Sequence, residues 1–184
     1  QKFIITTYAT PTWADSRYAY ISLDAGETWS IAYDSQALHG DIAAPEESHI
    51  HGACYDPWSD RFYISEGHGP AGGIYSSADN GATWVGPMRI EMRTPTAIPN
   101  NGATVLMATD DGIVLGSDNP ENGLFGILRR ENQADERIIQ TWRMHTGRAG
   151  LVTFAQRGWR DPATGYVYVT FRAEFADTPL TVAA

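Results

Sequence analysis

Short apolar runs, each bounded by turn-forming residues, follow one another along most of the chain. One clear pair is His49–Tyr55 and Arg61–Ser65, separated by the turn Asp56–Asp60. Runs of this length, rich in Ile, Tyr and Phe and flanked by Asp, Pro, Ser and Gly, are typical of β-strands. The 184 residues also include 18 Gly and 10 Pro, which suits a chain with many tight turns. The pattern predicts an all-β protein.

The predicted strands group into units of four, and the units repeat. The fullest unit covers 49–90, and its strands are His49–Tyr55, Arg61–Ser65, Ile74–Ser77 and Thr83–Val85. The next unit covers 104–143, and its strands are Thr104–Thr109, Ile113–Gly116, Leu124–Leu128 and Ile138–Trp142. Repetition at a spacing of about 20–50 residues is typical of solenoids and propellers.

Two incomplete units flank the whole ones. The first covers 1–34, lacks its first strand and has strands at Phe3–Tyr8, Tyr18–Ser22 and Trp29–Tyr33. The last covers 151–184, with strands at Leu151–Ala155, Tyr166–Phe171 and Thr178–Val182. Its turn Arg160–Gly165 matches the turn Asp56–Asp60 of the fullest unit. Residues 1–184 are therefore expected to form one partial repeat domain.

One eight-residue segment occurs twice, at Ser22–Trp29 and at Ser77–Trp84, and both copies read Ser-x-Asp-x-Gly-x-Thr-Trp. The segment is suited to close a β-hairpin. Its glycine can take a positive φ, and its aspartate can accept hydrogen bonds from backbone N–H groups of the turn. Its threonine favours the following strand, and its tryptophan can fill the gap between neighbouring sheets. Trp29 and Trp84 are accordingly expected to be buried.

These two segments resemble the Asp-box, or BNR repeat, of sialidases and other secreted β-propellers. The resemblance implies four-stranded antiparallel propeller blades, about three and a half to four of them in this chain. It also implies that the turns lie at the outer rim, away from the ligand channel. A structural role is therefore expected for the residues of both motifs: Ser22, Asp24, Gly26, Thr28, Trp29, Ser77, Asp79, Gly81, Thr83 and Trp84. The resemblance further implies a secreted or periplasmic protein.

Propellers close with about four to eight blades, so three and a half to four blades in this form leave an open arc with exposed sheet edges. Two explanations fit. The chain is a fragment of a longer propeller and associates with the rest of it, or two copies form a homodimer whose ring of seven or eight blades is closed. The sequence leaves both open.

Charge and cysteine content exclude several classes of function. The net charge of −9 disfavours nucleic acid as a partner. No apolar run approaches the ~20 residues that span a bilayer, so no membrane partner is expected. Cys54 is the one cysteine, which rules out an intrachain disulfide and favours a small core residue over a nucleophile.

Alignment of the units brings three acids into register at the ends of the second strands: Glu66, Asp118 and Glu174. They are the candidate catalytic residues and are expected on one face. Loops assigned to the same face add six candidate ligand-binding residues: His49, His51, His68, Arg93, Arg148 and Trp13. Together they predict acids, imidazoles and guanidinium groups around a channel mouth.

Each of these groups has a second interpretation. His49 and His51 share a face of one strand and could bind a metal with a further ligand such as Glu66, but a role as hydrogen-bonded channel residues is favoured and no metal is expected. The acids could bind sugar hydroxyls, act as acid and base in glycoside cleavage, or accept hydrogen bonds from loop amides. Arg93 and Arg148 could clamp a carboxylate or lie idle at the surface. Trp13 could stack on a sugar ring or pack between blades.

No cofactor is expected. The segment Gly67–Gly72 fits the dinucleotide-binding pattern G-x-G-x-x-G, but a strand follows it where that pattern requires a helix. The resemblance implies a carbohydrate-active protein, such as a glycoside hydrolase acting on an extracellular glycan. The alternatives are a non-catalytic propeller that binds glycan or protein, and a fragment without activity of its own. A true sialidase is disfavoured, because the Arg-Ile-Pro segment of that family is absent; Arg93-Thr94-Pro95 is a poor substitute.

Overall fold

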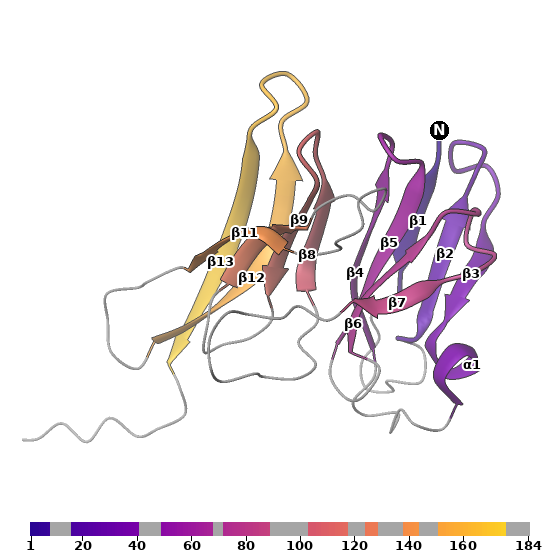
Figure 1. Ribbon diagram of the computed structural model, residues 1–184, viewed down its shortest axis with the longest axis horizontal. Coiled ribbons are helices and arrows are strands. Elements are labelled where there is room, and N and C mark those ends of the chain that lie inside the picture. Colours follow the sequence, from indigo (N-terminus) through magenta and orange to yellow (C-terminus); the bar gives the residue numbers. More distant parts are fainter. Residues whose placement is uncertain are drawn as a thin grey trace, which may run out of the picture.

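The computed structural model describes residues 1–7, 16–40, 49–67, 72–88, 103–117, 124–128, 138–143 and 151–175. These residues form β-strands and one short helix, and the strands are arranged in four antiparallel sheets that follow one another in chain order (Figure 1). None of these sheets closes on itself. The prediction of an all-β chain is confirmed. Within the described ranges, no helix is long and apolar enough to cross a membrane.

Each sheet is built from strands that are consecutive in the chain. The first sheet contains β1 (Phe3–Thr6), β2 (Tyr18–Ser22) and β3 (Ser30–Asp34). The second contains β4 (His49–Asp56), β5 (Arg61–Gly67), β6 (Gly73–Ser77) and β7 (Val85–Met88). The third contains β8 (Ala103–Ala108), β9 (Ile113–Ser117), β10 (Leu124–Leu128) and β11 (Ile138–Arg143). The fourth contains β12 (Leu151–Arg160) and β13 (Val167–Phe175).

Most predicted strands match the observed ones to within a few residues, and three differences stand out. The helix α1 (Ser35–His39), which follows β3 directly, is absent from the sequence prediction. The strands β12 and β13 are longer than predicted, so Glu174 lies inside a strand and not in a loop. The strands β3 and β7 begin only after Trp29 and Trp84, because Thr28 and Thr83 still belong to the turns. The predicted strand Thr178–Val182 lies outside the described residues.

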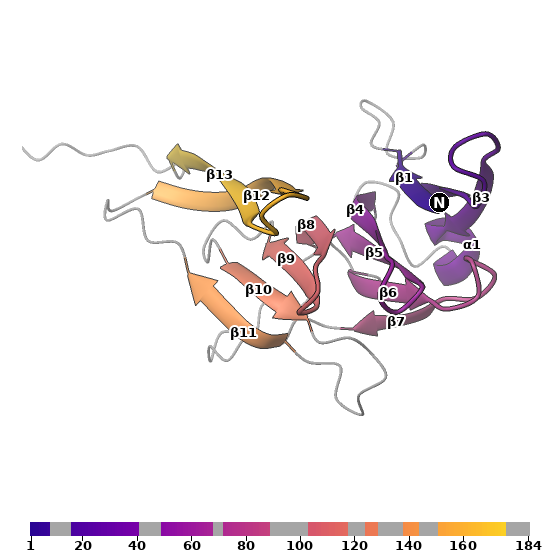
Figure 2. The ribbon, with the colours of Figure 1, turned by 90° about the horizontal axis from the view of Figure 1, so that it is seen from above.

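Successive sheets pack face to face. One core cluster joins Ala19 and Tyr33 of the first sheet to Ile50, Ile64 and Tyr75 of the second. Another joins Tyr63 and Ile74, on the other face of the second sheet, to the third sheet through Ala103, Leu106, Ile113 and Leu115. The first strands follow one another in space: β1 neighbours β4, β4 neighbours β8, and β8 neighbours β12. The strands β7 and β11 lie away from this line (Figure 2). Cys54 packs against the second cluster, and burial raises the pKa of its thiol well above its ordinary value.

The two copies of the repeated segment, here called the first repeat turn (22–29) and the second repeat turn (77–84), form the same hydrogen bonds. In the first, Oδ1 of Asp24 accepts from the backbone N–H of Thr28 at 2.9 Å, and Oδ2 accepts from its hydroxyl at 2.6 Å. The hydroxyl of Ser22 donates to Asp24 at 2.8 Å and accepts from Gly26 N–H at 2.8 Å. The second repeat turn reproduces all four distances.

Both turn glycines take positive φ, 96° at Gly26 and 83° at Gly81, as the sequence predicts. Gly81 also allows close packing, because a Cβ atom there would lie 2.6 Å from the Cβ atom of Ala32 in the first sheet. The turn aspartates are exposed, yet hydrogen bonds from threonine, chiefly from its hydroxyl, lower the pKa of Asp24 and of Asp79 from 3.8 to about 2.

Only one of the two motif tryptophans is placed as predicted. Trp84 is half-buried between the first two sheets, where its indole Nε1 donates to the carbonyl oxygen of Ala32 at 2.7 Å and its ring meets the Tyr33 ring edge-on at 5.3 Å. Trp29 is 41% exposed, and its Nε1 donates to Gly26 of its own turn at 3.1 Å. The prediction that Trp29 is buried is therefore wrong. In the described part of the chain, no sheet lies on the side of the first sheet that Trp29 occupies.

A second turn type also repeats. In the β4–β5 turn, Asp56 accepts from Trp58 N–H at 3.1 Å and from the Ser59 hydroxyl at 2.5 Å. In the β12–β13 turn, Asp161 accepts from Ala163 N–H at 2.9 Å and from the Thr164 hydroxyl at 2.6 Å. Both aspartates precede proline, and each carboxylate holds the turn in the same way. The predicted match between these turns is therefore confirmed.

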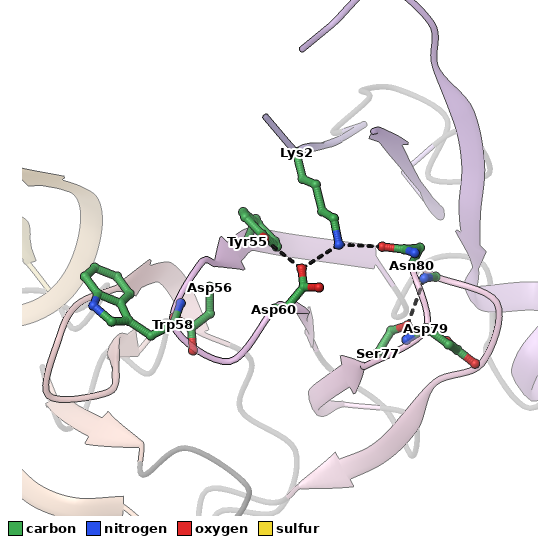
Figure 3. A network of polar contacts seen from close by, with 9 residues as sticks. Lys2, Tyr55, Asp56, Trp58, Asp60, Ser77, Asp79 and Asn80 are labelled. Atoms are coloured by element: carbon green, nitrogen blue, oxygen red, sulfur yellow. Dashed lines mark hydrogen bonds and ion pairs between the residues drawn. The ribbon is translucent and has the colours of Figure 1, made fainter. Parts of the chain in front are cut away.

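The hairpin turns and the repeat turns lie at one end of the sheets, here called the turn end, and a polar network joins them. Lys2, just before β1, donates to Asp60 at 2.5 Å and to the side-chain oxygen of Asn80 at 2.8 Å (Figure 3). The Tyr55 hydroxyl donates to Asp60 at 2.7 Å. Desolvation and this carboxylate raise the pKa of Tyr55 to about 12. The network ties the first sheet to two turns of the second.

The repeat-turn carboxylates predict a specific dependence of stability on pH. Their pKa is lower in the folded chain than the ordinary value of 3.8, so their stabilisation is present above pH 4 and is lost as the pH falls through about 2. Replacing both residues (Asp24→Asn with Asp79→Asn) should lower the melting temperature at pH 6 and reduce its fall between pH 4 and pH 2. Calorimetry across this range measures both quantities. Parallel curves for the two proteins would contradict the assignment.

The contact of Trp84 across the sheets predicts a large loss of stability on its removal. Trp84→Ala should lower the free energy of unfolding by about 3 kcal/mol, because it leaves a cavity beside Tyr33 and removes the donor to Ala32. Trp58→Ala is the matched control, since Trp58 is an exposed tryptophan on a turn. Urea unfolding at a fixed protein concentration should show a much smaller loss for the control.

Candidate functional site

The end of the sheets opposite to the turns, here called the histidine end, holds three of the predicted site residues. His49 begins β4, and Glu66 is next to the last residue of β5, so both lie far from the turn Asp56–Asp60 that joins these strands. His51 follows two residues after His49. The helix α1 lies at the same end (Figure 1).

Glu66 is fully buried between the first and the second sheet. Its Oε2 accepts a hydrogen bond from the Tyr33 hydroxyl, and its Oε1 accepts one from the Ser35 hydroxyl. His39 Nε2 lies 3.3 Å from Oε2 and 3.1 Å from the Tyr33 hydroxyl oxygen. A buried carboxyl group needs such partners, because desolvation without them costs several kcal/mol. Glu66 therefore acts here as a hydrogen-bond acceptor that joins two sheets.

The partners of Glu66 come from β3 and α1, and local sequence explains the helix. The Asp34 side chain caps α1 by accepting from the backbone N–H groups of Gln36 at 3.0 Å and Ala37 at 3.3 Å. Gly40, at φ 64°, ends it. This short helix carries Ser35 at its start and His39 in its last turn, so both can approach Glu66.

Burial and the neighbouring Glu66 raise the pKa of the Tyr33 hydroxyl far above its ordinary value. The Tyr33 ring also contacts the rings of Tyr75 and Trp84, at centroid distances of 5.8 Å and 5.3 Å. Tyr33 is therefore a neutral hydrogen-bond donor at neutral pH, and its ring belongs to the core between the sheets.

A β-bulge places the histidine pair. His49 pairs with Gly67, Ile50 with Glu66, and Gly52 with Ser65, so His51 is the extra residue of β4. The Nε2 atoms of His49 and His51 lie 2.6 Å apart, which is a hydrogen bond in which one ring donates and the other accepts. A Cβ atom at position 67 would overlap the His51 ring, so Gly67 leaves the space that His51 fills. Bulges often redirect side chains at functional sites.

The histidine pair and Glu66 lie on opposite faces of the second sheet. Along β5, Ile64 and Glu66 face the first sheet, whereas Tyr63, Ser65 and Gly67 face the other way; the Ser65 hydroxyl accepts from Ala103 N–H of the third sheet at 2.5 Å. The alternative in which His49, His51 and Glu66 surround one metal, which the sequence disfavours, is thus not formed. Among the residues that the structure describes, no three His, Cys, Asp or Glu side chains come close enough together to hold a metal ion.

The structure leaves several predicted site residues untested. Trp13, His68, Arg93, Asp118 and Arg148 lie outside the described residues. For Glu174 only the backbone is described: it pairs with Val152 and precedes the last residue of β13, as Glu66 precedes the last residue of β5. Both acids therefore lie at the ends of their strands remote from the hairpin turns.

Three residues of the site, Tyr33, Ser35 and His39, are missing from the sequence prediction. The Asp34-Ser35 pair before Gly40 is a capping signal that could have indicated α1. No local signal points to Glu66 as the partner, because it lies 33 residues after Tyr33 and in another sheet. Long-range pairing of this kind depends on how the sheets pack.

The Glu66 contacts predict a stability effect. Glu66→Gln should lower the free energy of unfolding by about 1–3 kcal/mol, because an amide keeps one acceptor oxygen and sets an N–H group against the hydroxyl of either Tyr33 or Ser35. Tyr33→Phe and the double variant complete a mutant cycle, measured by urea unfolding. The two changes should be clearly non-additive. Additive losses would show that the hydroxyl and the carboxyl group are not coupled.

Comparison with family models, with curated proteins and with solved structures finds no match to this chain. The resemblance to Asp-box proteins therefore rests on the two repeated segments and their shared hydrogen bonds.

Proposed function

We propose that this chain is part of an Asp-box β-propeller that binds a carbohydrate at the histidine end of its sheets. Each sheet is then one blade, and the two repeat turns are the rim motifs. One observation supports the binding site above all. A β-bulge directs the His51 ring toward His49 and into the space that Gly67 leaves.

The chemistry of the pair suits a sugar. A neutral imidazole offers one donor and one acceptor, and sugar hydroxyls have both capacities. His51 is half-buried, so its ring is fixed by the fold. Its Nδ1 atom is buried and its Nε2 atom contacts His49, so a sugar hydroxyl would bind by replacing one ring at the contact between the two Nε2 atoms. The end that holds the pair is remote from the polar network of Lys2, Asp60 and Asn80, which joins sheets and serves stability.

Non-catalytic binding is favoured over glycoside hydrolysis. A hydrolase needs two carboxyl groups about 5–9.5 Å apart that both reach the substrate. Glu66 is fully buried and already accepts hydrogen bonds from Tyr33 and Ser35, so it does not reach a substrate. A hydrolase stays the second candidate, because Glu66 and Glu174 lie at corresponding ends of β5 and β13. In that case Glu174 and Asp118 would supply the acids.

The extracytoplasmic location expected from the resemblance is part of the same proposal.

A glycan array followed by titration calorimetry tests the binding site. His51→Ala should weaken binding of the best glycan about tenfold, the effect of one or two lost hydrogen bonds. Tyr55→Phe removes a hydroxyl from another half-buried residue, at the turn end, and should leave the affinity unchanged. Equal affinities of the His51 variant and the parent for every bound glycan would refute the site, and the absence of any binding would refute the function.

Release of a chromophore from a panel of glycosides separates the two candidate functions. Binding without turnover is the expected result. Turnover that survives Glu66→Gln but is lost in Asp118→Asn or Glu174→Gln would support the hydrolase instead.

A further inference from the structure

The outer face of the first sheet carries the same residues that the second sheet uses to pack against the first. The motif alignment pairs Tyr20 with Tyr75 and Trp29 with Trp84. The strand register adds a third pair: Ile5 lies opposite Tyr20, as Ile64 lies opposite Tyr75. The two sheets thus present the same triad of Ile, Tyr and Trp.

In the second sheet this triad forms the interface with the first sheet. Ile64 and Tyr75 are buried against Ala19 and Tyr33. Trp84 donates to the main-chain carbonyl of Ala32, which is a contact with the backbone and therefore requires no particular side chain. The triad is therefore suited to pack on another β-sheet.

In the first sheet the described residues leave the triad largely uncovered, with Tyr20 half-buried. Ile5 is 52% exposed and Ile31, which lies opposite Tyr20, is 55% exposed. The indole Nε1 of Trp29 donates to the carbonyl oxygen of Gly26, within its own turn. The turn glycines show the same contrast: a Cβ atom at Gly81 would collide with Ala32 of the neighbouring sheet, whereas among the described residues one at Gly26 would approach Phe3 of its own sheet, at 3.9 Å.

The other end of the stack also carries exposed aromatic side chains. The inner face of the β12–β13 sheet packs on the third sheet, where a Cβ atom at Gly158 would lie 2.6 Å from Val105. On the opposite face Trp159 is 58% and Tyr168 is 50% exposed, and their rings stack at 5.4 Å. Both lie next to the β12–β13 turn, so this aromatic pair and Trp29 belong to the same end of the sheets.

We propose that the outer face of the first sheet, formed by Ile5, Tyr20, Trp29 and Ile31, binds the outer face of the β12–β13 sheet of a second copy of this chain. The second copy would continue the order of packing seen within the chain, in which the triad face of the second sheet meets the opposite face of the sheet before it. Such contacts are head-to-tail, and two of them related by a two-fold axis close a dimer. The proposal is independent of the carbohydrate site.

Two variants and a control test the proposal by light scattering at about 20 µM protein. The parent chain should have twice the monomer mass of 20.2 kDa. Ile31→Glu and Trp159→Glu should each give monomers, because each places a charge in both copies of the interface. Leu38→Glu, which charges an exposed apolar residue on α1, should remain a dimer. Circular dichroism verifies that all four proteins are folded.

Mixing the two monomeric variants distinguishes the proposed contact from a symmetric one. The intact first-sheet face of Trp159→Glu can bind the intact β12–β13 face of Ile31→Glu, so an equimolar mixture should recover a heterodimer with one unaltered interface. A monomeric parent chain overturns the proposal. So does a dimer that Ile31→Glu dissociates and Trp159→Glu does not, because that result means that two first-sheet faces pack on each other.

Discussion

A β-sheet with apolar side chains on both faces has to be covered on both, and this constraint organises the molecule. In the second sheet, Tyr63 faces one neighbour and Ile64 the other, and both are fully buried. The centre of each face is apolar, and the polar side chains at its margin, such as Ser65 and Glu66, form hydrogen bonds to the neighbouring sheets, so the sheet is suited to a place between two others. The first and the last described sheets follow the same plan with one face uncovered.

The stacking of sheets also decides what each end of the molecule can do. At the turn end, carboxylates of Asp24, Asp56, Asp79 and Asp161 are occupied by hydrogen bonds within their own turns. At the histidine end, alternation along one strand separates neighbours: Glu66 enters one interface, and Gly67 makes room for a histidine on the opposite face. Residues 66 and 67 are adjacent in β5, yet Glu66 has a structural role and Gly67 borders the histidine pair of the proposed binding site.

The sequence predicts the features that depend on short segments. The strands, the positive φ of Gly26 and Gly81, and the acceptor role of the turn aspartates all follow from residues within one hairpin. Features that depend on neighbouring sheets are predicted only in part. Trp29 and Trp84 have the same local sequence, yet their exposure differs because only Trp84 has a sheet beside it. The bulge at His51 and the partners of Glu66 likewise depend on pairing between strands, and no periodicity along the chain encodes it.

The local closure of the repeat turns also bears on how the chain folds. All four hydrogen bonds of each turn join residues at most four positions apart. Closing a loop this short takes on the order of 100 ns or less, whereas contacts between sheets bring together distant parts of the chain and form slowly. The turn can therefore fix the register of β2 with β3, and of β6 with β7, before either sheet has met its neighbour. Errors in assembly would then arise in the order of the sheets rather than in the pairing within a hairpin.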